Sequence, residues 1–310
     1  MTVAQQPQKA TLARGLFGNA YLLLALSGLC WSSNHILGRA VAAHVPPFAL
    51  SSARYFLAAL VVYPFARVHL REDWPAIRVR LGVMTFLSAT GGGLFAASQY
   101  LGLQLTSALN VSVMNSVVPV LIAVVATLIF GDRLTGRQML GFVVSLIGVL
   151  AIITRLDTHV LTTLAFNWGD LLILLNMLLF AIYSAALRLR PNIHWLSFLF
   201  MFSLLSGITT LPFWAWEHAH GRTLQPDWLT AFTLVYVTIV VTIMAYMSWN
   251  RGVELIGPNR AGVFLHLVPI YSALLAGVLL GEPLMGYHVA GFALILAGVY
   301  CAARSSGELA

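Results

Sequence analysis

Two long apolar segments of this chain carry polar residues and a proline at matching positions. The first, TSALNVSVMNSVVPVLIAVVATLIF, covers residues 106–130, and the second, IGPNRAGVFLHLVPIYSALLAGVLL, covers residues 256–280. Over the 50 residues that begin at Gly102, 15 are identical to the residue 150 positions later, and Pro119 matches Pro269. Shared apolar composition would not align glycines and prolines. The chain is therefore duplicated, and each half brings polar groups to membrane depth.

The composition is that of an integral membrane protein. Hydrophobic residues make up 59% of the chain and charged residues 9%, whereas charged residues make up about 25% of a soluble domain. The two cysteines, Cys30 and Cys301, both lie in apolar segments and define no disulfide framework. The net charge of +7 comes from basic residues that we place in loops, so it does not indicate binding to nucleic acid.

Ten apolar windows of about 20 residues follow one another, each long enough for a helix to cross a bilayer. They cover residues 19–42, 48–68, 80–102, 106–130, 138–155, 168–188, 195–215, 228–250, 256–280 and 285–303. We predict an all-α integral membrane protein with ten transmembrane helices. Because each half, 1–155 and 156–310, has an odd number of helices, the halves cross the membrane in opposite senses. The predicted fold is two inverted five-helix repeats around a central cavity.

Basic residues distinguish the two sides of the membrane. With the N-terminus inside, the inner side carries Lys9, Arg14, Arg67, Arg71, Arg78, Arg80, Arg133, Arg137, Arg188, Arg190, Arg251, Arg260 and Arg304, and the outer side carries Arg39, Arg155 and Arg222. Cytoplasmic loops are enriched in Lys and Arg. Both termini are therefore predicted to lie in the cytoplasm, with the protein in the bacterial inner (plasma) membrane.

Polar residues inside the spans are the candidate binding residues, because polar groups are costly at membrane depth. In the first span Trp31, Asn34 and His35 lie close together on the helix, and in the sixth Phe180 and Tyr183 lie at helical spacing. One interpretation is the wall of a substrate cavity. The other is hydrogen bonding between neighbouring helices.

The fourth and ninth spans carry the matched prolines. Ser112 and Asn115 precede Pro119, and His266 precedes Pro269. Each proline removes a backbone donor and frees a carbonyl group one turn earlier, which favours a cavity wall that bends during gating over a packed kink. Both His35 and His266 could carry protons or act as neutral hydrogen-bond partners.

The third and eighth spans end in polar and aromatic residues. Gln99 and Tyr100 close the third, and Tyr246 and Trp249 lie near the end of the eighth. Tyr100 and Trp249 could also anchor the helices at the membrane surface. Tyr246 lies about one turn deeper and is the stronger cavity candidate.

Charged residues give little sign of chemistry. All ten acidic residues fall in loops or near the ends of spans, and Arg54, inside the second span, is interpreted as structural, reaching toward the surface or pairing with Asp170. No fixed charge is then expected in the cavity. The sequence has no H-E-x-x-H motif of metalloproteases and no G-x-S-x-G motif of serine hydrolases. A phosphate-binding loop of the Walker A type is also excluded, because Lys9 is the only lysine. We predict no enzyme activity, cofactor or metal site.

Glycines at seven-residue spacing mark two packing helices. Gly141 and Gly148 lie in the fifth span, and Gly291 and Gly298 occupy the equivalent positions in the tenth. Small residues on one face let helix backbones approach closely. We predict that these two spans pack structurally and take no part in binding.

Several motifs resemble the drug/metabolite transporter superfamily in its ten-helix EamA branch. They are LCWSSNH at residues 29–35, PFALSSARYFLA at 47–58, Gly131-Asp132 after Pro119, and Gly257-Pro258 and Gly281-Glu282 around Pro269. The resemblance implies secondary transport by alternating access through a central cavity, with the fifth and tenth helices peripheral. The overall pattern is most similar to bacterial exporters of aromatic amino acids.

The expected partners are a small-molecule substrate, such as an amino acid or metabolite, and membrane lipid, and a monomer is compatible with the sequence. Aromatic and amide side chains suit an aromatic amino acid. The absence of a fixed charge argues against phosphorylated substrates. The alternatives are export of lipophilic cations, a membrane-embedded enzyme and a channel.

Overall fold

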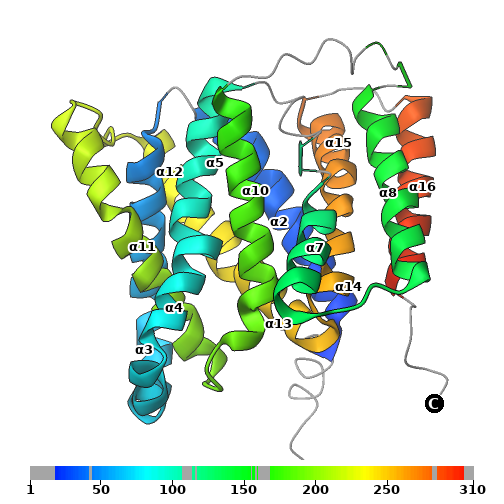
Figure 1. Ribbon diagram of the computed structural model, residues 1–310. Helices are drawn as coiled ribbons and strands as arrows, with labels where there is room; N and C mark the ends of the chain where they lie inside the picture. The colour runs from blue at the N-terminus through cyan, green and yellow to red at the C-terminus, as the bar shows by residue number, and fades with distance from the viewer. Residues whose placement is uncertain are drawn as a thin grey trace, which may run out of the picture.

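The computed structural model describes residues 18–41, 44–106, 114–115, 117–154, 156–157, 159, 168–280 and 285–303. These residues form a bundle of helices without any strand (Figure 1). In chain order the segments are α2 (Ala20–Val41), α3 (Pro47–Val79), α4 (Leu81–Ser88), η1 (Ala89–Gly93), α5 (Leu94–Leu105), α7 (Val118–Phe130), α8 (Gly136–Thr154), α10 (Trp168–Ala186), η2 (Leu187–Leu189), α11 (Trp195–Ala219), α12 (Trp228–Tyr236), η3 (Val237–Met244), α13 (Ala245–Ile256), α14 (Pro258–Gly262), η4 (Val263–His266), α15 (Leu267–Leu280) and α16 (Gly286–Ala303).

Every predicted span contains helix within the described residues. Segments α4, η1 and α5 form one continuous helix, as do α12, η3 and α13, and the central segment of each is π-helical. In the described part of the chain, six continuous helices are long and apolar enough to cross a membrane, and α7, α8 and α16 are shorter apolar helices. The prediction of an all-helical membrane protein is confirmed.

The second span is longer than the sequence suggested. Its predicted end was residue 68, but α3 continues to Val79 and is 33 residues long. A helix of this length reaches roughly 50 Å, well beyond a hydrocarbon layer of roughly 30 Å. The additional turns carry Arg71, Glu72 and Asp73, and hydropathy cannot detect a helix that continues past the membrane with charged residues.

Prolines and glycines end the helices where the sequence placed boundaries. Pro47 is the first residue of α3 and Pro258 the first residue of α14, where a helix needs no N–H donor. Gly131, at the end of α7, and Gly257, between α13 and α14, have φ values of 70° and 79°. Glycine adopts such positive φ values without a steric penalty. The predicted starts of the second and ninth spans and the predicted end of the fourth agree with these positions within two residues, whereas the eighth span was predicted to end at residue 250 and continues to Ile256.

Equivalent helices of the two halves pack against each other in antiparallel orientation. At one edge of the bundle, Gly141 of α8 faces Gly298 of α16, and Gly148 faces Gly291 (Figure 1). Contacts that pair increasing residue numbers with decreasing ones require the two helices to run in opposite directions. The glycines make these close contacts, which confirms the predicted packing role.

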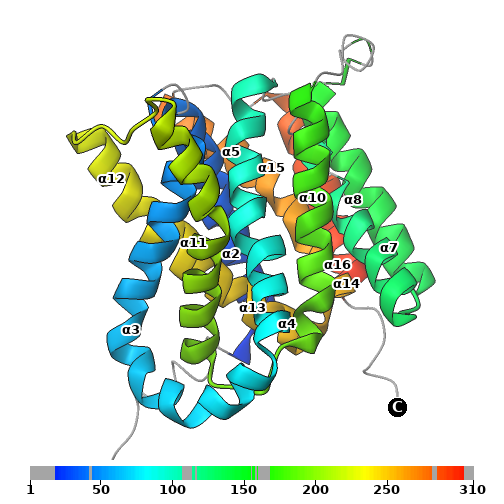
Figure 2. The ribbon, with the colours of Figure 1, turned by 60° about the vertical axis from the view of Figure 1, so that its left-hand side comes forward.

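Helices α3 and α11 also lie side by side in antiparallel orientation (Figure 2), and each caps the other. Near the start of α3, the backbone N–H of Ala49 donates to Oε2 of Glu217 over 2.8 Å. At the start of α11, the backbone N–H of His194 donates to Oδ2 of Asp73 over 3.0 Å. Each helix therefore supplies, near its own C-terminal end, a carboxylate that accepts a hydrogen bond from a free N–H at the start of the other helix. The negative charge also complements the dipole of that other helix.

Replacement of Glu217 by alanine is expected to destabilise the protein by about 1–2 kcal/mol, because it removes a buried helix cap. Glu217 is fully buried, so after its removal no water is at hand to accept the hydrogen bond from the Ala49 N–H. The measurement is thermal unfolding of the purified protein in detergent. Glu72→Ala, the neighbour of the equivalent acid Asp73, is the control. Equal melting temperatures for Glu217→Ala and the wild type would contradict the capping role.

An ion pair joins the end of α7 to the end of α10. Nη1 and Nη2 of Arg188 donate to Oδ1 and Oδ2 of Asp132 over 2.9 and 2.6 Å. The Arg188 guanidinium also lies 4.3 Å from the ring centroid of Phe130. Hydrogen bonds from Arg188 lower the pKa of Asp132. The pair connects the two halves of the chain at one side of the bundle.

We expect Asp132→Asn to reduce stability at pH 7 by less than about 1 kcal/mol, because the pair is partly exposed. The folded-state pKa of Asp132 is lowered, so the ion pair contributes fully above about pH 4, the ordinary pKa of Asp, and less as the pH falls through the lowered pKa. Melting curves between neutral and acidic pH should therefore converge for the two proteins. Asp157→Asn, an exposed acid, is the control, and a constant difference across pH would contradict this assignment.

Candidate functional site

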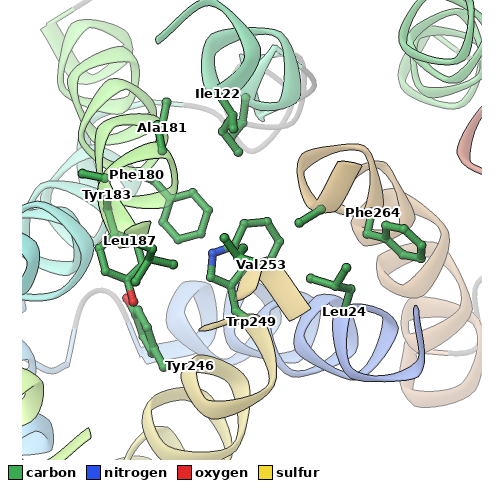
Figure 3. Close-up of a cluster of buried hydrophobic side chains, with 14 of the residues drawn as sticks. Leu24, Ile122, Phe180, Ala181, Tyr183, Leu187, Tyr246, Trp249, Val253 and Phe264 are labelled. Carbon is green, nitrogen blue, oxygen red and sulfur yellow. The ribbon is translucent and has the colours of Figure 1, made fainter. Parts of the chain in front are cut away.

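Aromatic side chains from three helices meet at the centre of the bundle. Trp31 of α2 lies 5.3 Å from Phe180 of α10 and 5.4 Å from Trp249 of α13, measured between ring centroids. Tyr183 and Tyr246 extend the group, at 5.9 Å from Phe180 and 5.8 Å from Trp31. Figure 3 shows Phe180, Tyr183, Tyr246 and Trp249 side by side. We call these five residues the aromatic cluster.

Two hydroxyl groups of the aromatic cluster form hydrogen bonds, whereas one of its indole N–H groups lacks an acceptor in the described part of the chain. The Tyr183 hydroxyl donates to Oδ1 of Asn250 over 2.5 Å, and the Tyr246 hydroxyl donates to the carbonyl oxygen of Gly91. The indole N–H of Trp249 is buried and has no acceptor among the described residues. Buried polar atoms normally have a partner. An unused donor within an apolar cluster is therefore available to a bound molecule.

The contact between Tyr246 and Gly91 lies at the π-helical segments. Gly91 lies in η1, and Tyr246 is the second residue of α13, which directly follows η3. A β-carbon added to Gly91 would lie 2.2 Å from Cδ2 of Tyr183. The wider turn of a π-helix and the missing side chain let α10 and α13 approach the third span closely here.

Arg54 of α3 lies beside the aromatic cluster in a shell of tyrosines. Its Nη2 donates to the Tyr55 hydroxyl over 2.8 Å, and its Nη1 donates to the Tyr100 hydroxyl over 3.1 Å. The guanidinium carbon lies 4.5 Å from the ring centroid of Tyr55. Arg54 is only 2% exposed, so it does not reach the membrane surface. The predicted partner, Asp170, instead accepts a hydrogen bond from Thr106, and both interpretations of Arg54 were wrong.

Three predicted residues join this polar region. The Tyr100 hydroxyl donates to Oδ1 of Asn34 over 3.1 Å, and Nε2 of His35 lies 2.9 Å from Nε2 of Gln99. These contacts connect α2 to α5. Asn34 is thus hydrogen-bonded directly to Tyr100, which also binds Arg54.

The interpretation of Tyr100 and Trp249 as surface anchors is wrong. Trp249 has no exposed surface and Tyr100 is 5% exposed. The sequence placed both near the ends of predicted spans, but the helices continue beyond them to Leu105 and Ile256. Both rings therefore lie well inside the bundle.

The other predicted residues belong to the fourth and ninth spans. Nδ1 of His266 is 2.5 Å from the Ser145 hydroxyl on α8, so this histidine faces a helix predicted to be peripheral. Asn115 is half-buried just before α7, and Ser112 lies outside the described residues. Pro119 is the second residue of α7, and Pro269 the third residue of α15.

Sequence reasoning did not place Arg54 or Tyr55 among the binding candidates. The two residues are adjacent within the motif at residues 47–58, and Asn250 follows Trp249 at the polar end of the eighth span. A charged side chain inside an apolar window was the available signal for Arg54. From sequence alone, pairing with Asp170 offered a simpler explanation for this charge.

The groups at the site are aromatic rings, amides, hydroxyls and a guanidinium. Among the described residues no group of three His, Cys, Asp or Glu side chains could hold a metal ion. The aromatic rings offer stacking surfaces, and the amides, hydroxyls and guanidinium offer hydrogen bonds and charge. Such a combination can hold a small amphipathic molecule.

Comparison with known proteins identifies the family. The model of the EamA-like transporter family matches residues 18–154 and again residues 167–304. An uncharacterized transporter, YetK of Bacillus subtilis (strain 168), is 26% identical over 91% of this chain and 86% of its own length. A probable amino-acid metabolite efflux pump of Salmonella typhimurium (strain LT2) is 26% identical over 90% of this chain and 92% of its own length.

A solved crystal structure of another protein has the same fold, with a TM-score of 0.72 over 91% of this chain and 96% of that one, at 20% sequence identity. The two segments that match the family model cover the two halves of the helical bundle. The chain belongs to the EamA-like transporter family.

Proposed function

We propose that this transporter exports aromatic or hydrophobic amino acids, or related amphipathic metabolites, from the cytoplasm. The observation that supports this is the aromatic cluster, where five rings from three helices lie beside hydroxyl, amide and guanidinium groups. An aromatic substrate would replace ring-to-ring contacts within the cluster by equivalent contacts of its own. The relative that is named a probable amino-acid metabolite efflux pump points to the same class.

The proposed mechanism is alternating access between residues 1–155 and 156–310. Paired helices such as α3 and α11 belong to different halves, so rocking of one half against the other would open the centre to one side at a time. The cluster lies between the halves, with Trp31 from the first and Phe180 and Trp249 from the second. In the described conformation these rings are in contact with one another.

Buried charge favours amino acids over lipophilic cations. Arg54 places a positive charge beside the cluster, and no described acid forms an ion pair with it. A cation at the cluster would be repelled in a medium of low dielectric. The alternative of cationic drug export is therefore less well supported than amino acid export.

The test is flux of labelled phenylalanine in proteoliposomes, with and without an imposed pH gradient. We expect flux in the wild type, and Trp31→Ala should weaken substrate binding about two- to tenfold through the loss of ring contacts. Trp228→Ala, which removes a tryptophan that is 81% exposed on α12, is the matched control. Absence of phenylalanine flux under both conditions would contradict the proposed substrate class.

Proline replacements test the gates. Pro119→Ala and Pro269→Ala are each expected to slow flux by about two- to tenfold, while the substrate Kd changes less, because Pro119 lies where α7 begins and Pro269 lies where the 3-10 segment η4 gives way to α15. Pro212→Ala, within α11 and exposed, is the control. Unchanged flux in both variants would remove the prolines from the mechanism.

A further inference from the structure

Arg54 is a buried positive charge without a negative partner in the described part of the chain. It is 2% exposed, and the ion pairs formed by described residues involve other cations. The groups that surround its guanidinium are the hydroxyls and rings of Tyr55 and Tyr100. These groups accept hydrogen bonds and provide cation–π attraction, but they leave the charge of the site positive.

An uncompensated charge at this depth is costly, so burial of an arginine for a purely structural role is unfavourable. Its Nε N–H is also buried without an acceptor among the described residues. Buried polar atoms that lack a partner call for an explanation, and a ligand absent from the structure is one. The unused donor and the unbalanced charge both favour an anion.

The tyrosine shell connects Arg54 directly to the aromatic cluster. The Tyr55 hydroxyl lies 3.3 Å from the Tyr246 hydroxyl, and the Tyr246 ring lies 5.8 Å from that of Trp31. Tyr246 therefore belongs to both groups. On the other side, the Tyr100 hydroxyl reaches Asn34. A molecule with an anionic end and an aromatic ring would find both complements within one continuous site.

We propose that Arg54, held by Tyr55 and Tyr100, is the binding site for the carboxylate of the transported substrate. This inference rests on the proposed function and specifies how that site recognises its ligand. A carboxylate can take two N–H donors of a guanidinium at once, so it would use Nε together with donors now shared with tyrosine hydroxyls. The ring of the substrate then lies at the aromatic cluster, and Asn34 and the Gly91 carbonyl oxygen are acceptors for an ammonium group.

The experiment measures equilibrium binding of three labelled probes to the purified full-length protein in detergent. The probes are 3-phenylpropionate, its neutral amide 3-phenylpropionamide, and phenethylamine, which share a ring and differ in charge. We expect the wild type to bind the carboxylate at least about tenfold more tightly than the amide, as a charge-assisted hydrogen bond provides, and the amine most weakly.

Variants assign this preference to Arg54. Arg54→Gln should abolish the difference between carboxylate and amide, and Arg54→Lys, which keeps the charge, should restore most of it. Arg188→Gln, which removes an arginine from the ion pair at the end of α10, is the matched control and should retain the preference. A carboxylate preference that survives in Arg54→Gln would overturn the proposal.

Binding of the three probes to the wild type tests the proposal even if Arg54→Gln fails to fold. Equal affinity of the wild type for 3-phenylpropionate and its amide would by itself overturn the proposal. The two proposals fail separately. Carboxylate binding that depends on Arg54, without phenylalanine flux, would support the site and reject amino acid export. Phenylalanine flux without any carboxylate preference would support export and reject Arg54 as the carboxylate site.

Discussion

Gly91→Ala is expected to abolish most transport and to lower the melting temperature by about 5 °C or more, because it forces a methyl group into the ring of Tyr183. The added β-carbon would lie 2.2 Å from Cδ2 of that ring. Tyr183 is fully buried and held by Asn250, so it has no room to move away. The variant also displaces the Gly91 carbonyl group that accepts from Tyr246.

The same span provides the control. Gly82 lies at the start of α4, with no heavy atom within 4 Å of an added β-carbon, so Gly82→Ala introduces the same methyl group without a clash. Flux of phenylalanine in proteoliposomes and thermal unfolding in detergent should be nearly unchanged in Gly82→Ala. If Gly91→Ala behaves like this control, the close approach of α10 to the third span has no functional importance.

The helical fold could be predicted from the sequence because two strong signals carry it. Apolar windows determine where helices form in a bilayer, since every backbone group must find a partner within the segment. Prolines and glycines such as Pro47, Gly131 and Gly257 mark the ends. The end of α3 was missed because its last turns are charged, and beyond the membrane hydropathy gives no signal.

The site was predictable only in part. Helical spacing placed Trp31, Phe180 and Tyr183 on inward faces, and the structure brings them together. Helical spacing shows which residues share a face, but it does not show which neighbouring helix that face contacts. It therefore could not indicate that His266 faces α8 or that Asp170 contacts Thr106. Those contacts depend on the relative rotation of helices far apart in the sequence.

The environment of Arg54 also could not be predicted from the sequence, and this residue matters most for the proposed function. From sequence, a basic residue near the start of a span is most simply interpreted as reaching the surface or pairing with an acid. The structure surrounds it with tyrosines from α3 and α5 instead. Whether a buried charge is paired is a property of packing, and pairing decides whether the charge is structural or available to a ligand.

Gly298→Ala should give the largest loss of stability among the interface glycines, about 3 kcal/mol, because the obstruction is backbone and cannot rotate away. An added β-carbon would lie 2.5 Å from the Ser145 nitrogen and 2.6 Å from the Gly141 carbonyl oxygen. Helices α8 and α16 would have to separate, and packing at small residues is the main attraction between helices in lipid.

The control for this interface is Gly286→Ala at the start of α16, where nothing lies within 4 Å of an added β-carbon. Thermal unfolding of both variants measures the difference, and phenylalanine flux at a temperature where both remain folded tests the role of the helix pair. If α8 and α16 only support the bundle, Gly298→Ala should melt earlier yet keep its substrate affinity. A loss of affinity at full folding would show that this edge of the bundle is coupled to the aromatic cluster.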